Sequence, residues 1–266
     1  KSFSFKENEE NAIDSNDLIY SNLILGLRDY VNKNNFPGVV IGISGGIDSA
    51  FSACVAADAL GPDRVKGILM PSKFTSNASN EDADQLGKNL GIGLESISIE
   101  EIVKAYDITL DPIFKGSKKD ITEENIQSRA RGSLLMAYSN KFGHMVLTNG
   151  NKSEVSVGYS TLYGDMCGGF SVVKDLYKSE LYKLAEWRNN CIPSASLLDK
   201  KSVIPQNIIT KEPTAELKPN QMDKDTLPPY EVLDQILYLL VEKESSISEI
   251  VDKGFDFEVV TKVQNM

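Results

Sequence analysis

The chain carries a β-branched run, Val39 to Ile43, that passes through Gly45-Gly46 straight into an apolar segment over residues 47–60. A run of this kind is typical of a strand covered on both faces, and the two glycines predict a tight turn into a helix. Because such a strand needs helices on both of its faces, this unit indicates a layered α/β fold.

The same alternation of strands and helices returns along the chain. Further strands are predicted over residues 65–70, 94–99 and 145–148, and helices over residues 17–34, 79–90 and from Thr122 onward. Ser79 and Asp82 have the spacing of a capping box, and Thr122 can cap the helix that follows it. We therefore predict a doubly wound, mainly parallel sheet with helices on both faces. Helical periodicity over residues 230–241, 246–253 and 256–263 predicts a helical C-terminal part, and we expect no second core.

The amino-acid composition argues against several classes of partner and binding site. The 266 residues include 28 Lys and Arg against 38 Asp and Glu, and the net charge of −10 disfavours a nucleic-acid partner. A single histidine, His144, excludes metal sites built from several histidines. No apolar run approaches the roughly 18 residues of a membrane span, and the polar start has no signal-peptide core. We expect a cytoplasmic protein with no membrane partner.

The stretch from Gly42 to Ser49 is the segment that points to chemistry. Glycines at the end of a strand leave backbone N–H groups free to converge on an anion at the helix N-terminus. The stretch lacks the lysine of a Walker loop and does not match G-x-G-x-x-G, so a pyrophosphate group fits it better. Asp48 beside phosphates makes sense if a divalent cation, Mg²⁺, lies between them. The alternative is a tight turn whose Ser and Asp only cap a helix.

Six residues of this loop, Ser44-Gly45-Gly46-Ile47-Asp48-Ser49, resemble the loop of the N-type ATP pyrophosphatases, which split ATP into AMP and pyrophosphate. Later segments narrow the resemblance to NAD synthetases over about residues 24–264: Asn125-Ile126-Gln127-Ser128-Arg129, Thr148-Asn149-Gly150-Asn151-Lys152-Ser153-Glu154, Leu162-Tyr163-Gly164-Asp165, Lys211-Glu212-Pro213-Thr214-Ala215-Glu216-Leu217 and Pro228-Pro229-Tyr230-Glu231. The residues of several segments most resemble those of the synthetase domain of glutamine-dependent NAD synthetases. This resemblance implies an adenine nucleotide alpha hydrolase-like fold.

The resemblance also implies a domain organisation. We expect one NAD synthetase domain over residues 1–266, with residues 1–16 as a linker or disordered lead, and no nitrilase-like glutaminase domain in this chain. An excised domain and a free-standing enzyme both remain open. The family's C-terminal basic segment is missing here, which puts closure of the site in doubt. Family members are homodimers, so we expect a homodimer or a higher homo-oligomer.

The activity implied by the resemblance is ATP-dependent amidation of deamido-NAD to NAD through an adenylated carboxylate, with release of AMP and pyrophosphate. Ammonia is the direct nitrogen donor, whether supplied as ammonia or from glutamine, and Mg²⁺ assists. Three alternatives stay open: amidation of nicotinate mononucleotide, a tRNA-modifying ligase, and a nucleotide-binding module without turnover. The net charge of −10 argues against the tRNA ligase.

By resemblance, the residues that contact ATP are Ser44, Gly45, Gly46, Ile47, Asp48, Ser49, Met70, Thr148, Lys178 and Thr214. Asp48 and Glu154 are expected to hold the metal, and Asn125, Arg129, Glu154 and Asp165 to contact deamido-NAD. Asp48 and Asp165 are the expected catalytic residues, with Asp165 orienting ammonium or taking its proton. Asn125 and Arg129 lie four apart, so on a helix they share one face. Plainer interpretations are a helix-start acid for Glu154 and a Gly-Asp turn for Asp165.

Overall fold

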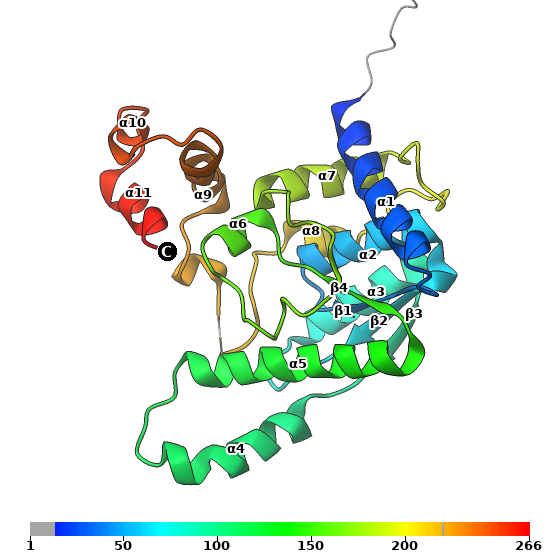
Figure 1. Ribbon diagram of the computed structural model, residues 1–266, viewed down its shortest axis with the longest axis horizontal. Coiled ribbons are helices and arrows are strands. Elements are labelled where there is room, and N and C mark those ends of the chain that lie inside the picture. Colours follow the sequence, from blue (N-terminus) through cyan, green and yellow to red (C-terminus); the bar gives the residue numbers. More distant parts are fainter. Residues whose placement is uncertain (1–13, 220) are drawn as a thin grey trace, which may run out of the picture.

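A five-stranded parallel sheet forms the centre of the computed structural model, which describes residues 14–219 and 221–266 (Figure 1). Its strands are β1 (Val39–Ile43), β2 (Val65–Leu69), β3 (Gly93–Ser96), β4 (Met145–Thr148) and β5 (Phe170–Ser171). They pair in the order β3-β2-β1-β4-β5, and each pair is parallel. The predicted doubly wound sheet is confirmed, although β3 ends at Ser96 and β5 has no counterpart among the predicted strands.

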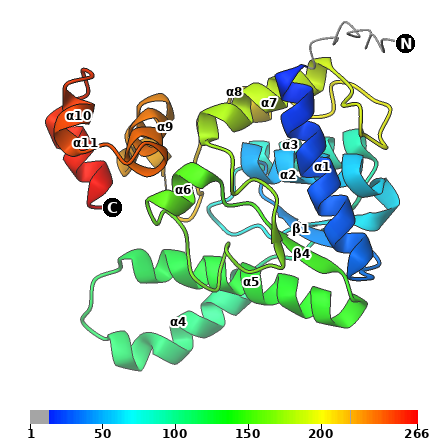
Figure 2. The same cartoon turned by 45° about the horizontal axis from the view of Figure 1, so that its top comes forward.

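Side-chain alternation along β1 explains why both faces are covered. Val39, Ile41 and Ile43 join a core that α1 (Ser15–Lys33), α2 (Ile47–Leu60), α3 (Asn77–Leu90), α7 (Lys178–Asn190) and α8 (Gln206–Thr210) share. Val40 points to the opposite face, where it packs with residues that follow β3 and with α5 (Ile121–Phe142). Figures 1 and 2 show α5 and α4 (Glu100–Phe114) on this second side of the sheet. Successive strand residues face opposite sides, so a continuous apolar strand requires both layers.

Two of the predicted helix caps are wrong by a few residues. Helix α3 begins at Asn77, and Ser76 caps it by accepting the Ser79 N–H at 3.1 Å, so Ser79 lies inside the first turn. Helix α5 begins at Ile121 with Asp120 as its cap, because that carboxylate accepts the Thr122 N–H at 2.8 Å. In both helices the cap is a polar side chain two or three residues before the backbone N–H group that it accepts, and it gives this first-turn N–H group a hydrogen-bond partner.

Several helices of the structure begin at other residues than predicted or were not predicted at all. Helix α1 starts at Ser15, inside the stretch predicted as a lead, whereas residues 1–13 of that stretch lie outside the described residues. Helices α4, α7 and α8 were not among the predicted elements. Short elements complete the chain: η1 (Pro62–Arg64), α6 (Lys152–Ser156) and η2 (Asp223–Asp225). Within residues 14–219 and 221–266, no helix combines the length and the apolar character needed to cross a membrane.

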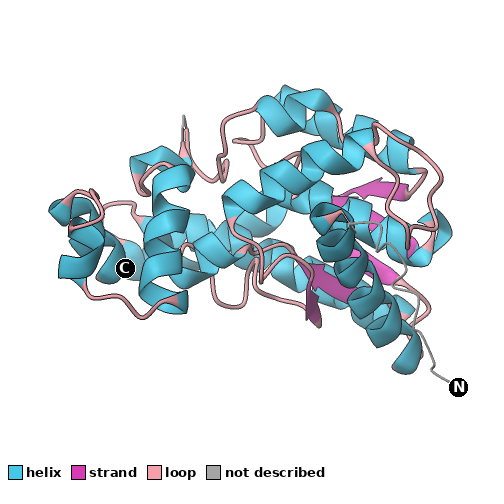
Figure 3. Cartoon of the chain, turned by 90° about the horizontal axis from the view of Figure 1, so that it is seen from above, coloured by secondary structure: helices cyan, strands magenta, loops and turns pink. Residues whose placement is uncertain are grey.

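The expectation of no second core is wrong, because the C-terminal helices have a core of their own. Helix α9 (Tyr230–Leu237), the π-helical turn η3 (Tyr238–Glu242), α10 (Ile247–Val251) and α11 (Phe257–Gln264) pack around an apolar cluster of their own. Figure 3 shows these helices to one side of the strands. The cluster also includes Val157 and Tyr177, which flank α6 and α7. We call this unit the C-terminal cluster.

Candidate functional site

A cavity of about 380 Å³ opens at the carboxyl ends of β1, β2 and β4. Its wall is formed by the loop after β1, the segment after β2, one face of α5, the segment after β4 and the chain between α8 and η2. In doubly wound sheets, ligands bind at this edge, where the strand order reverses on either side of β1. The size lies within the usual range of small-ligand pockets.

The loop from Ser44 to Ser49 is a cradle of hydrogen-bond donors. Gly45 has φ +75°, and a Cβ there would lie 2.3 Å from the carbonyl oxygen of Ser79, so the turn requires glycine. Ser44 and Ser49 hold the loop together, with their hydroxyl oxygens 3.1 Å apart, and the Gly46 N–H donates to Ser44 Oγ at 3.2 Å. Gly46 is the N-cap of α2 and has no side chain to cap it. The first-turn N–H groups of α2 can therefore receive an anion.

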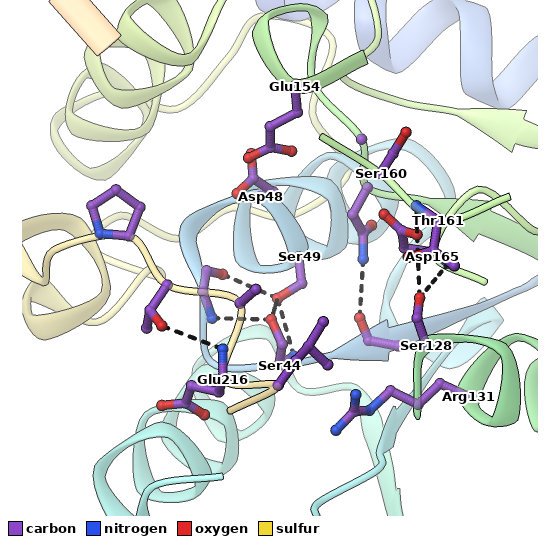
Figure 4. A pocket seen from close by; sticks show the side chains of 18 of the residues that line it. Ser44, Asp48, Ser49, Ser128, Arg131, Glu154, Ser160, Thr161, Asp165 and Glu216 are labelled. Carbon is purple, nitrogen blue, oxygen red and sulfur yellow. Dashed lines mark hydrogen bonds between the residues drawn. The ribbon is translucent and has the colours of Figure 1, made fainter. Parts of the chain in front are cut away.

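A buried lysine joins the two carboxylates predicted to hold a metal. Lys178 Nζ lies 2.6 Å from Asp48 Oδ2 and 2.9 Å from Glu154 Oε1, and the Lys178 side chain is only 2% exposed. Figure 4 shows Asp48 and Glu154 pointing toward one another. Asn151 completes the arrangement, because its amide donates to Asp48 Oδ1 at 2.7 Å and its Oδ1 accepts the Glu154 N–H at 2.9 Å.

The charges in this cluster shift one another's protonation. Burial raises the pKa of Glu154 well above its usual value; Lys178 opposes this rise and the like charge of Asp48 adds to it. Burial alone would lower the pKa of Lys178, but the two carboxylates outweigh it and hold that pKa above its usual value. Two carboxylates kept together by one cation are a donor set that suits Mg²⁺, which takes one or two carboxylates plus phosphate oxygens. Across the described residues, no group of three or more His, Cys, Asp or Glu side chains gathers as a metal site.

The opposite end of the cavity is built around Asp165. Its Oδ1 accepts the Thr161 N–H at 2.7 Å and the Ser128 hydroxyl at 3.2 Å, while the Asp165 N–H donates to Ser128 Oγ at 3.0 Å (Figure 4). Asn125, one helical turn before Ser128, accepts the Thr161 hydroxyl at 2.8 Å. Burial raises the pKa of Asp165 above its usual value, although these hydrogen bonds oppose the rise. Asp165 therefore holds a turn together through these hydrogen bonds, and the same residue borders the cavity.

Most of the predicted site residues line this cavity: Ser44, Gly46, Ile47, Asp48, Ser49, Met70, Asn125, Glu154, Asp165, Lys178 and Thr214. Gly45 does not border the cavity, but its backbone conformation shapes the loop that does. Thr148 is buried at the end of β4 and does not border the cavity. Arg129 also lies outside the wall, because it is exposed and its Nε donates to the Leu162 carbonyl oxygen at 3.2 Å.

Several wall residues were missed by the sequence predictions. Arg131 reaches the cavity from α5, with its Nε donating to the Met70 carbonyl oxygen at 3.0 Å, and burial lowers its pKa to about 10. The spacing of Ser128, Arg131 and Leu135 at i, i+3 and i+7 is a signal that could have identified it. Glu216 and Lys211 contact α3 and the loop from Ser44 to Ser49: Glu216 Oε1 accepts the Ser79 hydroxyl at 2.8 Å, and Lys211 Nζ donates to the Gly45 carbonyl oxygen at 3.0 Å.

Known proteins match this chain across nearly all of its length. The family model described as NAD synthase matches residues 19–266. The glutamine-dependent NAD(+) synthetase of Thermotoga maritima is 54% identical over 244 residues, which are 92% of this chain and 41% of that protein. The chain thus spans less than half the length of this relative.

Solved structures give the same picture. A glutamine-dependent NAD+ synthetase from Acinetobacter baumannii in complex with ADP has a TM-score of 0.72 at 45% identity, covering 97% of this chain and 45% of that one. An NH3-dependent NAD synthetase from Campylobacter jejuni has a TM-score of 0.73 at 27% identity, covering 96% and 93%. An NMN synthetase from Francisella tularensis has a TM-score of 0.72 at 28% identity, covering 84% and 87%.

Proposed function

Because this chain belongs to the NAD synthase family, we propose that it catalyses the ATP-dependent amidation of deamido-NAD to NAD, with release of AMP and pyrophosphate. The observation that carries the proposal is that one cavity joins the loop from Ser44 to Ser49, the Asp48–Lys178–Glu154 cluster and the hydrogen-bonded carboxyl group of Asp165. A ligase that activates a carboxylate with ATP needs a site for pyrophosphate beside a site for the acceptor acid, and this cavity holds both sets of groups.

The phosphate end would bind the triphosphate of ATP. The first-turn N–H groups of α2 and the hydroxyl groups of Ser44 and Ser49 are the donors, and Met70 borders the cavity at the end of β2. Asp48 and Glu154 would hold Mg²⁺, which when bound offsets negative charge developing on pyrophosphate. Lys178 already pairs with both carboxylates and would turn toward the phosphates once a metal takes its place between them. Thr214, which borders the cavity, remains a proposed ATP contact, and Thr148 is not proposed as one because its buried side chain lies outside the cavity wall.

The acceptor end would bind the nicotinate part of deamido-NAD. Asn125 and Asp165 border the cavity there, and Arg129 lies just outside it, where it could reach the more distant part of the dinucleotide. Asp165 would orient ammonium, or accept its proton, as nitrogen attacks the adenylated carboxyl carbon and AMP leaves. A carboxylate whose pKa is raised is a stronger base than an ordinary aspartate, which suits it to accept a proton.

Two partners are proposed beyond the substrates. The relatives are about twice as long and are named glutamine-dependent, which supports a glutamine-hydrolysing domain as the natural source of ammonia. We also propose a homodimer in which α4 and α5 contact a second copy. Helix α4 has no buried side chain, and Ile108 and Ile113 on it are 67% and 75% exposed. An apolar surface of this kind is typical of a protein interface.

The test of the activity is direct. The protein is incubated with ATP, Mg²⁺ and deamido-NAD, with either ammonium or glutamine, and NAD, AMP and pyrophosphate are measured by mass spectrometry. NAD from ammonium, equimolar with AMP and absent with Asp48→Asn, is the expected result. Formation of AMP without NAD, or no nucleotide turnover at all, would contradict the proposal.

The alternatives are read from the same assay. Amidation of nicotinate mononucleotide is the second candidate, because an NMN synthetase shares the fold at 28% identity, and replacing deamido-NAD with that mononucleotide decides between them. Binding of ATP without turnover would instead indicate a nucleotide-binding module, and turnover only with tRNA would indicate a tRNA-modifying ligase. The dimer is tested by size-exclusion chromatography, where a mass near 29.3 kDa, one protomer, would contradict it.

A further inference from the structure

Three consecutive residues of α6 are each bound by the C-terminal cluster. Lys152 pairs with Glu242, the Ser153 hydroxyl donates to Asp234 Oδ1 at 2.5 Å, and Glu154 Oε1 lies 3.4 Å from the Tyr230 hydroxyl. Helix α6 has only five residues, too few to be stable by its own hydrogen bonds. The direction of the Glu154 side chain therefore depends on contacts from outside α6.

The same face of α9 also binds the start of α7. Asp234 Oδ2 accepts the Ser179 N–H at 2.8 Å, and the Lys178 N–H donates to Ser153 Oγ at 2.9 Å. The Lys178 ammonium group lies 5.1 Å from the centre of the Tyr230 ring. Tyr230 and Asp234 are four residues apart, so one turn of α9 contacts both α6 and α7. Figures 1 and 2 show α9 beside α6.

These contacts are buried and satisfied, as expected of groups that define an orientation. Ser153 is fully buried and Asp234 is 5% exposed, and both oxygens of Asp234 accept hydrogen bonds. The Tyr230 hydroxyl donates to Asp223 Oδ2 at 2.9 Å, and Asp223 is 4% exposed. Because a buried polar group without a partner costs free energy, α9 can dock on α6 and α7 in few other arrangements.

We propose that Tyr230 and Asp234 are positioning residues through which the C-terminal cluster sets the orientation of Glu154 and Lys178. The inference rests on the proposed function, since Glu154 is taken there to bind Mg²⁺ and Lys178 to bind phosphate. The Tyr230 hydroxyl has one proton, which it donates to Asp223, so Tyr230 acts by holding its ring and hydroxyl oxygen against Lys178 and Glu154. Asp234 acts through Ser153 and the N-terminus of α7. Groups that orient a metal ligand commonly change metal affinity about 10–100-fold when they are removed.

The test compares Tyr230→Phe and Asp234→Asn with two matched controls on the same cluster, Tyr238→Phe and Asp252→Asn, whose side chains are exposed. Binding of α,β-methylene ATP, which cannot be split between its α- and β-phosphates, is measured by isothermal titration calorimetry with Mg²⁺ and again with EDTA. We expect the Mg²⁺-containing dissociation constant to rise about tenfold in the two positioning variants. The EDTA value and both control variants should stay within about twofold of the unaltered chain.

The other outcomes are decisive as well. If the Mg²⁺-containing dissociation constant is unchanged in both positioning variants, or rises equally with EDTA, Tyr230 and Asp234 serve only the fold and the inference is overturned. Should Asp234→Asn fail to fold, Tyr230→Phe, which removes one oxygen atom, decides alone. If the unaltered chain itself binds the analogue no better with Mg²⁺ than with EDTA, the failure lies in the proposed function.

Discussion

Replacement of Lys178 by methionine tests whether the ion cluster is held together as the structure indicates. The change keeps a linear side chain of similar length but removes the charge between Asp48 and Glu154. Loss of one partner from a buried ion pair commonly costs about 3–5 kcal/mol, because the remaining charge is left unpaired. Asp48 and Glu154 are 19% and 16% exposed, so water can reach them in part. We therefore expect a loss of about 3 kcal/mol, at the lower end of that range.

The loss of stability should appear as a lower thermal unfolding midpoint and should depend on pH. At about 2–4 °C per kcal/mol for a chain of this size, the unfolding midpoint should fall by about 6–12 °C. Burial already raises the native pKa of Glu154, and removal of Lys178 takes away a charge that opposes the rise. The native state then binds the proton more tightly than the unfolded chain, so stability declines as pH rises through that window. The deficit should be smaller near pH 5 than near pH 8.

Differential scanning calorimetry at both pH values, with and without Mg²⁺, is the assay. Mg²⁺ at 100 times its dissociation constant would restore about 2.7 kcal/mol if the two carboxylates bind it. Lys183→Met, an exposed position on the same helix, is the matched control and should change stability by less than about 0.5 kcal/mol. If Lys178→Met unfolds within 1 °C of the unaltered chain at pH 8, the reasoning about the unpaired carboxylates is wrong.

Three further predictions concern other parts of the chain. Gly45→Ala places a Cβ against the Ser79 carbonyl oxygen at a φ of +75°, which costs about 1–2 kcal/mol from the backbone alone. Isothermal titration calorimetry should therefore show weaker ATP binding. An unchanged affinity would mean that the loop can shift without cost. Arg188→Met leaves Asp58, fully buried like Arg188, without its cation, and urea unfolding should show a loss of about 3–5 kcal/mol; a loss under about 1 kcal/mol would refute the role of that pair. Burial raises the native pKa of Asp165, so its contribution to the free energy of unfolding falls as pH rises from about 4 through that pKa. Asp165→Asn removes this fall, and its urea midpoint relative to the unaltered chain should rise from pH 4 to pH 7; a constant difference would contradict the burial argument.

The parts of the fold that were predicted correctly depend on short segments. The strand at Val39–Ile43, the glycine turn and α2 follow from residues within about twenty positions, because strand pairing and the turn need only apolar runs and a residue that tolerates positive φ. Helix α4 was missed although Val103 packs against the core on this side of the sheet, because none of its side chains is fully buried and Pro112 within it is a residue that usually ends a helix. The caps at Ser76 and Asp120 were missed by a few residues, since several nearby polar side chains could serve.

The loop from Gly42 to Ser49 and the role of Asp48 were predicted from residue types at a strand end, whereas the other site residues were predicted from the resemblance to NAD synthetases. Their arrangement needed the folded chain. Lys178 lies 130 positions from Asp48, and only packing of α7 beside α2 and α6 brings its ammonium group to both carboxylates. Arg131 rather than Arg129 enters the cavity because the docking of α5 on the sheet sets which face of the helix is covered. Orientation of this kind is set by long-range burial, and no local pattern of residues contains that information.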